Sequence, residues 1–94
     1  MKYQRADQGT QGPEGVHMRI LKYQIESTCV MLPVGARVLH VGLQDGVACV
    51  WALVNPLEKH QNIHIVLGTG SEVPCDAVHE GTWLQEGFVW HLFR

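Results

Sequence analysis

The sequence is poor in positive charge and has no long hydrophobic run. Seven Lys and Arg residues stand against nine Asp and Glu, which gives a formal net charge of -2. Clustered Lys and Arg dominate binding to a phosphate backbone, so this composition argues against a nucleic acid partner. No apolar run approaches the about 20 residues that cross a bilayer, and residues 1–10 are polar throughout. A soluble, non-secreted protein of the cytoplasm, with no membrane partner, is therefore expected.

Cysteine is also scarce. The three cysteines, Cys29, Cys49 and Cys75, are widely spaced and include no C-x-x-C pair. An odd number at such spacing favours free thiols in a reducing compartment over a disulfide framework. Each is expected to act as a small buried hydrophobic residue.

The length allows one domain. Ninety-four residues suffice for one hydrophobic core, although a chain of this size buries only about 60% of its unfolded surface. Residues 1–17 combine several glycines, a proline and polar neighbours without apolar periodicity, so a flexible, disordered N-terminal arm is expected there. Residues 18–94 are expected to form a single β domain, and Met18 as well as Met1 could start translation.

From Met18 onward, short strands alternate with turns. Leu21, Tyr23 and Ile25 fall on one face of the first segment, with the period of two typical of a half-buried strand. Further strands are predicted at 28–32, 37–44, 47–54, 62–67, 81–85 and 88–93. Asp45-Gly46 and Glu86-Gly87 predict the turns of two β-hairpins. No sustained 3.6-residue period occurs, although 71–79 could form one helical turn. The pattern predicts an all-β fold, a small antiparallel β-sandwich or a partly open barrel of about seven short strands.

Two of the predicted strands are apolar on both faces. In residues 47–54 both alternate sets are apolar, and residues 88–93 divide into Phe88, Trp90 and Leu92 against Val89, His91 and Phe93. A sheet buried on one side alternates apolar and polar residues, so the second face should also be covered. Another subunit, a loop or a ligand could cover it, and self-association into a homo-oligomer is the commonest solution.

Several motifs resemble a known family. The runs are LPVGARVLHVGLQDGVACVWALVNP (residues 32–56), IHIVLGTG (residues 63–70) and GTWLQEGFVWHLF (residues 81–93). In this order they resemble a small family of uncharacterised all-β domains, a domain of unknown function found in bacteriophage and bacterial genomes. The resemblance implies an all-β fold and a mobile-element setting, hence a host-cell cytoplasm if a phage encodes the chain. It supplies no activity to transfer.

A glycine turn and a histidine are candidate ligand contacts. Gly68, Thr69 and Gly70 follow a predicted strand, and their backbone N–H groups could form an anion-binding nest, although a plain strand-ending turn is the commoner role. No Walker lysine follows. His91 lies on an otherwise apolar face, where it could be satisfied by a backbone carbonyl or donate a hydrogen bond in a ligand pocket.

Tryptophans and arginines complete the candidate binding residues. Trp51, Trp83 and Trp90 could pack in the core or stack on a nucleobase. Trp83, in a predicted edge hairpin with polar neighbours, is the one expected at the surface. Arg37 and Arg94 could pair with phosphates or simply be solvated.

No arrangement of residues indicates catalysis or a metal. His60 and His64 are four residues apart on a predicted strand, which separates them by about 13 Å, so neither a metal site nor another cofactor is expected. The cysteines and serines lack an activating motif, and the carboxylates read as turn residues. We therefore expect a non-catalytic protein.

Two functions remain open from sequence. One is a phage accessory protein that counters host defence by sequestering a nucleotide-like immune signal between subunits of a homo-oligomer. The other is a protein-interaction or virion accessory module, whose partner is a host or phage protein.

Overall fold

The fold is all-β. A computed structural model describes residues 17–94 and contains seven strands and no helix in that range. The strands are β1 (Arg19–Gln24), β2 (Cys29–Pro33), β3 (Arg37–Gln44), β4 (Val47–Val54), β5 (His60–Gly68), β6 (His79–Gln85) and β7 (Phe88–Phe93). The predicted fold class is confirmed, whereas the helical turn considered for residues 71–79 is not formed. The expected arm, residues 1–17, lies outside the described residues except for His17.

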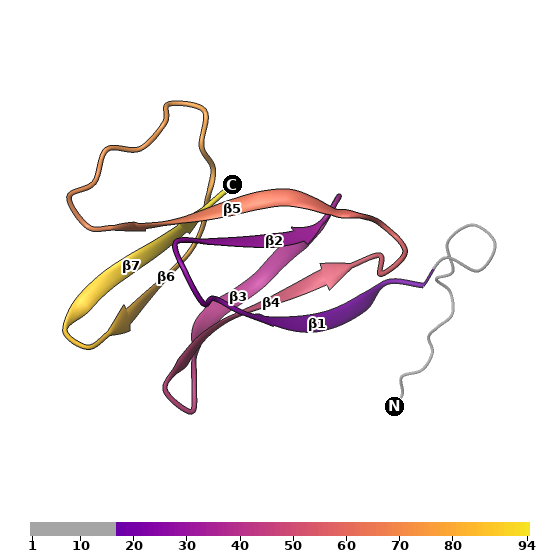
Figure 1. Ribbon diagram of the computed structural model, residues 1–94, viewed down its shortest axis with the longest axis horizontal. Coiled ribbons are helices and arrows are strands. Elements are labelled where there is room, and N and C mark those ends of the chain that lie inside the picture. The colour runs from indigo at the N-terminus through magenta and orange to yellow at the C-terminus, as the bar shows by residue number, and fades with distance from the viewer. Residues whose placement is uncertain (1–16) are drawn as a thin grey trace.

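The strands form two antiparallel sheets arranged like a sandwich (Figure 1). One sheet has the order β1-β4-β3 and the other the order β2-β5-β7-β6. At one side of the sandwich, β3 packs directly against β6. A Cβ at Gly81 would lie 2.5 Å from Val41 Cγ2, so the missing side chain of Gly81 permits this contact.

Both predicted hairpins are present, and their turns have the expected backbone. Asp45 and Gly46 have φ of 52° and 79°, and Glu86 and Gly87 have φ of 53° and 83°. Positive φ at both central residues is the type I′ pattern that matches the twist of paired strands. These turns place β3 beside β4 and β6 beside β7.

The core lies between the two sheets. Leu21, Tyr23 and Ile25 of the first strand segment pack against it, as the alternation predicted. Burying a Val or Leu side chain contributes about 1.5–3 kcal/mol. The buried cluster consists of Val30, Leu32, Val41, Ala48, Val50, Ala52, Val54, Trp83 and Leu92.

The second face of β4 is partly covered by side chains of the same sheet. His40 of β3 lies over Trp51, with ring centroids 5.5 Å apart. Lys22 of β1 donates a hydrogen bond to Gln44 of β3, and this bridge spans the two strands on either side of β4. The cover is partial, because Trp51 and Leu53 remain half-buried, and Val47 and the neighbouring Ile20 of β1 are exposed on the same side.

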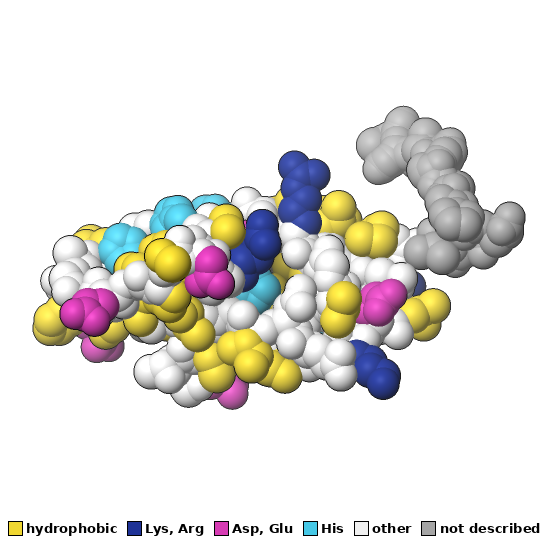
Figure 2. Space-filling model, turned by 90° about the horizontal axis from the view of Figure 1, so that it is seen from above, with side chains coloured by type: hydrophobic (Ala, Val, Ile, Leu, Met, Phe, Trp, Pro, Cys, Tyr) yellow, Lys and Arg dark blue, Asp and Glu magenta, His cyan; other side chains and the backbone are white. Residues whose placement is uncertain are grey.

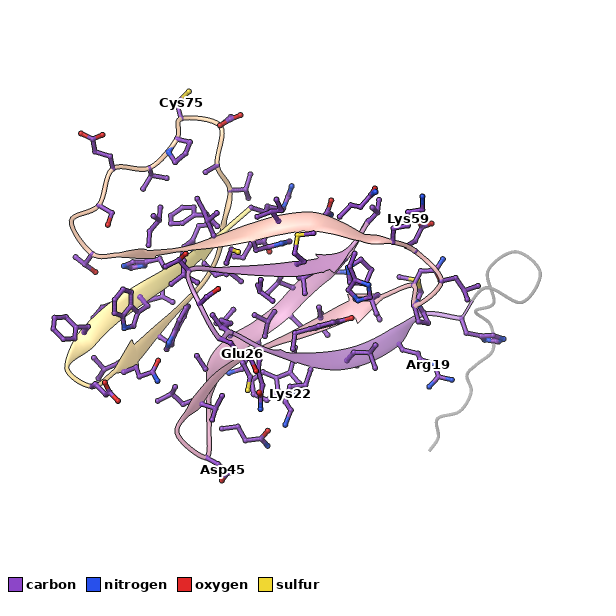
Figure 3. The ribbon with its side chains drawn as sticks, viewed as in Figure 1. Arg19, Lys22, Glu26, Asp45, Lys59 and Cys75 are labelled. Atoms are coloured by element: carbon purple, nitrogen blue, oxygen red, sulfur yellow. The ribbon has the colours of Figure 1, made fainter. Side chains whose placement is uncertain are left out.

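The cysteines differ in exposure. Cys49 is buried on β4, as expected, but Cys29 and Cys75 are exposed, so the expectation of burial is wrong for those two. Cys29 lies on the outer side of β2, and Cys75 lies in the β5–β6 connection, where Figure 3 shows it at the outer end of the loop. All three are free thiols.

Candidate binding sites

The most unusual feature of the second sheet is the orientation of β5. Ile63, Ile65 and Leu67 lie on one face of this strand. Asn62, His64 and Val66 lie on the other face. The polar member His64 is fully buried in the core, whereas Ile63 is 56% exposed. A shift of one residue in pairing would exchange the two sets, yet the observed register places the apolar set outward.

The register of the neighbouring strands extends this apolar surface, which we term the outer face. Ile65 pairs with Phe93, Leu67 with His91, and Leu84 with Val89. Leu84 is 62% exposed, and Val89 and Met31 are also exposed. Figure 2 shows histidines gathered among hydrophobic side chains at one end of the molecule. The outer face comprises Met31, Ile63, Ile65, Leu67, Leu84, Val89 and Phe93, together with His79, Thr82, His91 and Thr69.

A line of polar side chains crosses the outer face. The Thr82 hydroxyl lies 2.7 Å from His79 Nε2 and 2.9 Å from His91 Nδ1. The Thr69 hydroxyl lies 2.8 Å from His91 Nε2 and 3.3 Å from the Val89 carbonyl oxygen. The line therefore runs from β6 across β7 to the end of β5.

One assignment of protons satisfies the whole line. The Val89 carbonyl only accepts, so the Thr69 hydroxyl donates to it and accepts from His91 Nε2–H. His91 Nδ1 then accepts from the Thr82 hydroxyl, which in turn accepts from His79 Nε2–H. This arrangement satisfies His91 through two threonine hydroxyls, and it holds both rings in one orientation at the surface.

The glycine turn has a structural role at each position. Gly70 adopts a positive φ of 99°, and Ser71 N–H donates to the Gly68 carbonyl, closing the turn after β5. A Cβ on Gly68 would lie 3.3 Å from the Trp90 ring, so Gly68 makes room for that ring. Because the N–H groups of Thr69 and Ser71 already donate to carbonyls, the turn retains little capacity for a phosphate.

Trp83 is not at the surface. Only 7% of it is exposed, so the expectation of a surface tryptophan is wrong. Although β6 is the last strand of its sheet, its side against β3 is packed, and Trp83 faces the core. The Trp83 indole N–H donates to Gln85 Oε1 at 3.2 Å.

One edge of Trp83 contributes to a groove at an open end of the sandwich. The groove has a volume of about 320 Å³ and lies between the β1–β2 connection and the β6–β7 hairpin. Phe88 and Trp90 form its aromatic wall, with ring centroids 6.1 Å apart, and Glu26 and Glu86 are its charged lining residues.

The remaining candidates lie apart from each other. Trp51 is half-buried on the outer side of β4, and Arg37 is exposed at the start of β3, beside a pocket shared with Asn62, Glu80 and Arg94. The structure brings Gly68, Thr69, Gly70 and His91 together, but it does not bring Trp51, Trp83 or Arg37 to them.

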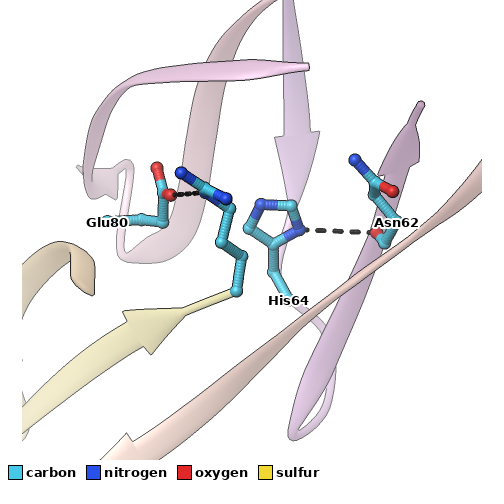
Figure 4. A network of polar contacts seen from close by, with 4 residues as sticks. Asn62, His64 and Glu80 are labelled. Carbon is cyan, nitrogen blue, oxygen red and sulfur yellow. Dashed lines mark hydrogen bonds and ion pairs between the residues drawn. The ribbon is translucent and has the colours of Figure 1, made fainter. Parts of the chain in front are cut away.

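His64 is a buried residue whose environment the sequence did not predict. Its Nδ1 lies 3.4 Å from the Asn62 carbonyl oxygen, and its Nε2 has no hydrogen-bond partner among residues 17–94. The ring lies between Asn62 and the ion pair of Arg94 with Glu80, whose N–O distance is 2.5 Å (Figure 4). Burial lowers the pKa of His64, while the Asn62 carbonyl and the Glu80 carboxylate oppose this shift and Arg94 adds to it.

Within residues 17–94, no group of three or more His, Cys, Asp or Glu side chains is placed to hold a metal ion. No helix in that part of the chain is long and apolar enough to span a membrane.

These features describe a small β-sandwich domain with an exposed apolar sheet face and an aromatic groove. Residues 17–94 match the model of a family described as a domain of unknown function, DUF7352, and the chain belongs to this family. No curated protein and no solved structure matches the chain.

Proposed function

We propose that this protein is a non-catalytic interaction module, an accessory protein of a phage or other mobile element, that associates through the outer face. The observation that carries this proposal is the orientation of β5, which buries His64 and exposes Ile63. Burying a histidine without full hydrogen bonding costs stability. A partner that covers the apolar side of β5 offsets this cost.

The chemistry of the outer face suits a protein surface as its partner. Its apolar residues surround the line of Thr69, His91, Thr82 and His79, in which both ring nitrogens of His91 and both threonine hydroxyls are hydrogen-bonded within the chain. When a partner buries this polar line, few new polar contacts are needed. The surrounding apolar residues add to the apolar area that the interface buries. The set defined above contains no Lys, Arg, Asp or Glu, and the charged residues that border it beside Ile63 and Ile65, Asp76 and Arg94, are of opposite sign, so two copies can meet without strong like-charge repulsion. Self-association into a homo-oligomer is therefore the first form of the proposal.

The test is the oligomeric state of the full chain and of two matched variants. Leu84→Lys places a charge on the outer face, whereas Leu57→Lys changes an 83% exposed leucine in the β4–β5 connection. Sedimentation velocity should show association of the wild-type chain at about 100 μM. Leu84→Lys should weaken it about tenfold or more, and Leu57→Lys should leave it unchanged.

Equal behaviour of the two variants would place the contact elsewhere. A wild-type chain that stays monomeric and retains no stoichiometric host or phage protein in a pull-down from infected cells would overturn the proposal.

A second candidate function is supported by the aromatic groove. We propose as this alternative that the protein sequesters a nucleotide-like immune signal of the host. The groove volume of about 320 Å³ falls within the range of small-ligand sites, and Phe88 and Trp90 offer surfaces on which a base could stack. Glu26 and Glu86 disfavour phosphates beside the base, so any recognition would rest on the ring.

Calorimetric titration with a panel of cyclic and ADP-ribose-type nucleotides tests this alternative. Saturable heat and a raised thermal midpoint would support it. Absence of both across the panel would overturn it, and neither outcome depends on the oligomeric state.

A further inference from the structure

We propose that the groove between the β1–β2 connection and the β6–β7 hairpin binds a small organic ammonium ion. This inference goes beyond the proposed interaction module, because the groove residues Trp83, Trp90 and Phe88 alternate with the outer-face residues Leu84 and Val89 along β6 and β7. The two sites therefore use opposite sides of the same hairpin.

The aromatic wall supplies the first half of the recognition. Phe88 and Trp90 lie with ring centroids 6.1 Å apart at an interplanar angle of 47°, and Phe88 is 65% exposed. The rings are thus inclined side by side rather than stacked on each other. A cation within about 6 Å of such a ring face is attracted by the ring quadrupole, most strongly for tryptophan.

The charge of the lining supplies the second half. Glu26 and Glu86 line the groove, and no Lys, Arg or His does. Figure 3 shows Glu26 at the connection between β1 and β2, so the carboxylates come from the two chain segments that border the groove. Within residues 17–94 neither carboxylate forms an ion pair, which leaves both available to a cationic ligand.

Glu86 is an unusual residue for its position in the β6–β7 turn. It has a positive φ of 53°, a conformation in which Asn, Asp or Gly is less strained than Glu. The equivalent position of the β3–β4 hairpin holds Asp45. Glu86 thus keeps a longer carboxylate beside the groove despite the backbone cost.

A discrete small cation fits better than an extended peptide. Two backbone N–H groups beside the groove are already paired, since Ile25 N–H donates to the Ala48 carbonyl and Val66 N–H donates to the Thr28 carbonyl. The Trp83 indole N–H is occupied by Gln85. Ring faces and carboxylates remain, and these recognise an alkylated ammonium group without further hydrogen bonds.

The experiment is an NMR titration of the full chain with choline and with its neutral isostere, 3,3-dimethylbutan-1-ol. The three tryptophans give separate indole N–H signals. Choline should shift those of Trp83 and Trp90 and leave that of Trp51 in place, because Trp51 lies on the outer side of the other sheet. The isostere has the same shape without the charge, and it should bind about tenfold more weakly.

Matched variants test the carboxylates. Glu86→Gln should weaken choline binding about threefold to tenfold, whereas Glu58→Gln, which removes one negative charge from the exposed β4–β5 connection, should leave it unchanged. Equal binding of choline and the isostere, or no shift with choline, would overturn the proposal. Tighter binding of a capped Ala-Lys-Ala peptide than of choline would also overturn it, in favour of a protein partner. None of these outcomes alters the sedimentation test of the outer face, so the two proposals fail separately.

Discussion

Ile63 and His64 are adjacent on β5 and lie in opposite environments. A hydrophobic residue next to a histidine would ordinarily be the buried one of the pair, but here His64 is buried and Ile63 is more than half exposed. Local alternation identifies the two sets of β5 without saying which set faces inward. Only the pairing of β5 with β2 and β7 decides this, since it turns the whole strand at once.

The burial of His64 predicts a pH dependence of stability. Desolvation lowers the pKa of His64 in the folded chain, so the unfolded chain binds a proton more readily than the folded one. The contribution of neutral His64 is fully present above the unfolded pKa of about 6.5, and it is lost as the pH falls through that value toward the lowered folded pKa.

Urea unfolding between about pH 8 and pH 5.5 measures this effect. The wild-type chain should lose stability as the pH falls. His64→Gln should reduce that slope, whereas His60→Gln, at an exposed position of the same strand, should preserve it. An unchanged slope in His64→Gln would assign the pH dependence to another group.

At the scale of elements, the contact between β3 and β6 depends on one glycine. A Cβ at Gly81 would lie 2.5 Å from Val41 Cγ2 and 2.8 Å from Val41 Cβ. Gly81→Ala should therefore destabilise the chain by about 1–3 kcal/mol through overpacking.

Gly42→Ala on β3 is the matched control for this change. Its closest neighbour would be the flexible end of His40, at 2.9 Å, so its cost should be smaller. Chemical denaturation compares the two variants, and Val41→Ala in the Gly81→Ala background should recover part of the loss. Equal costs at both glycines would contradict a specific contact between the strands.

The two hairpin turns differ in strain. Glu86 adopts a left-handed backbone conformation that costs about 1–2 kcal/mol of stability, whereas Asp45 is a favoured residue in its turn. Glu86→Asn should raise the free energy of unfolding by about 1 kcal/mol, and Asp45→Asn should leave it nearly unchanged. Thermal denaturation at pH 7 measures both, and a destabilised Glu86→Asn would show that the Glu86 side chain contributes contacts that outweigh the strain.

At the scale of the whole molecule, the outer sides of the two sheets differ in how many apolar residues they expose. The side chains of His40, Lys22 and Gln44 cover part of β4 from within the same sheet, although Ile20 and Val47 stay exposed on that side. The outer face of β5 and its neighbours exposes more apolar residues, among them Ile63, Leu84 and Val89. Dissolved salt screens interactions between charges, so it does not weaken an interface made of uncharged apolar residues.

Self-association should therefore persist or tighten when the salt concentration rises to about 0.5 M. Dilution calorimetry at several temperatures should also give a negative heat-capacity change for association, the mark of apolar burial. Association that salt dissociates would indicate ion pairs and would move the interface away from the outer face.

Strand number, both hairpin turns and the pattern of β1 could be read from the sequence because they depend on local chemistry. Asp45-Gly46 and Glu86-Gly87 specify their turns through residues adjacent in the chain. The same local chemistry identifies the glycine turn and His91 as candidates, and they lie together in the structure.

Tertiary structure alone decided which side of β5 and of β6 is buried and which distant residues meet. Trp83 is buried because β6 packs against β3, a contact between segments about forty residues apart. His64 is buried, and Ile63 exposed, because the register of the sheet orients β5 as a unit. Local sequence therefore determined the strands and turns, while packing between strands determined that the apolar outer face, rather than a tryptophan at an edge, is exposed.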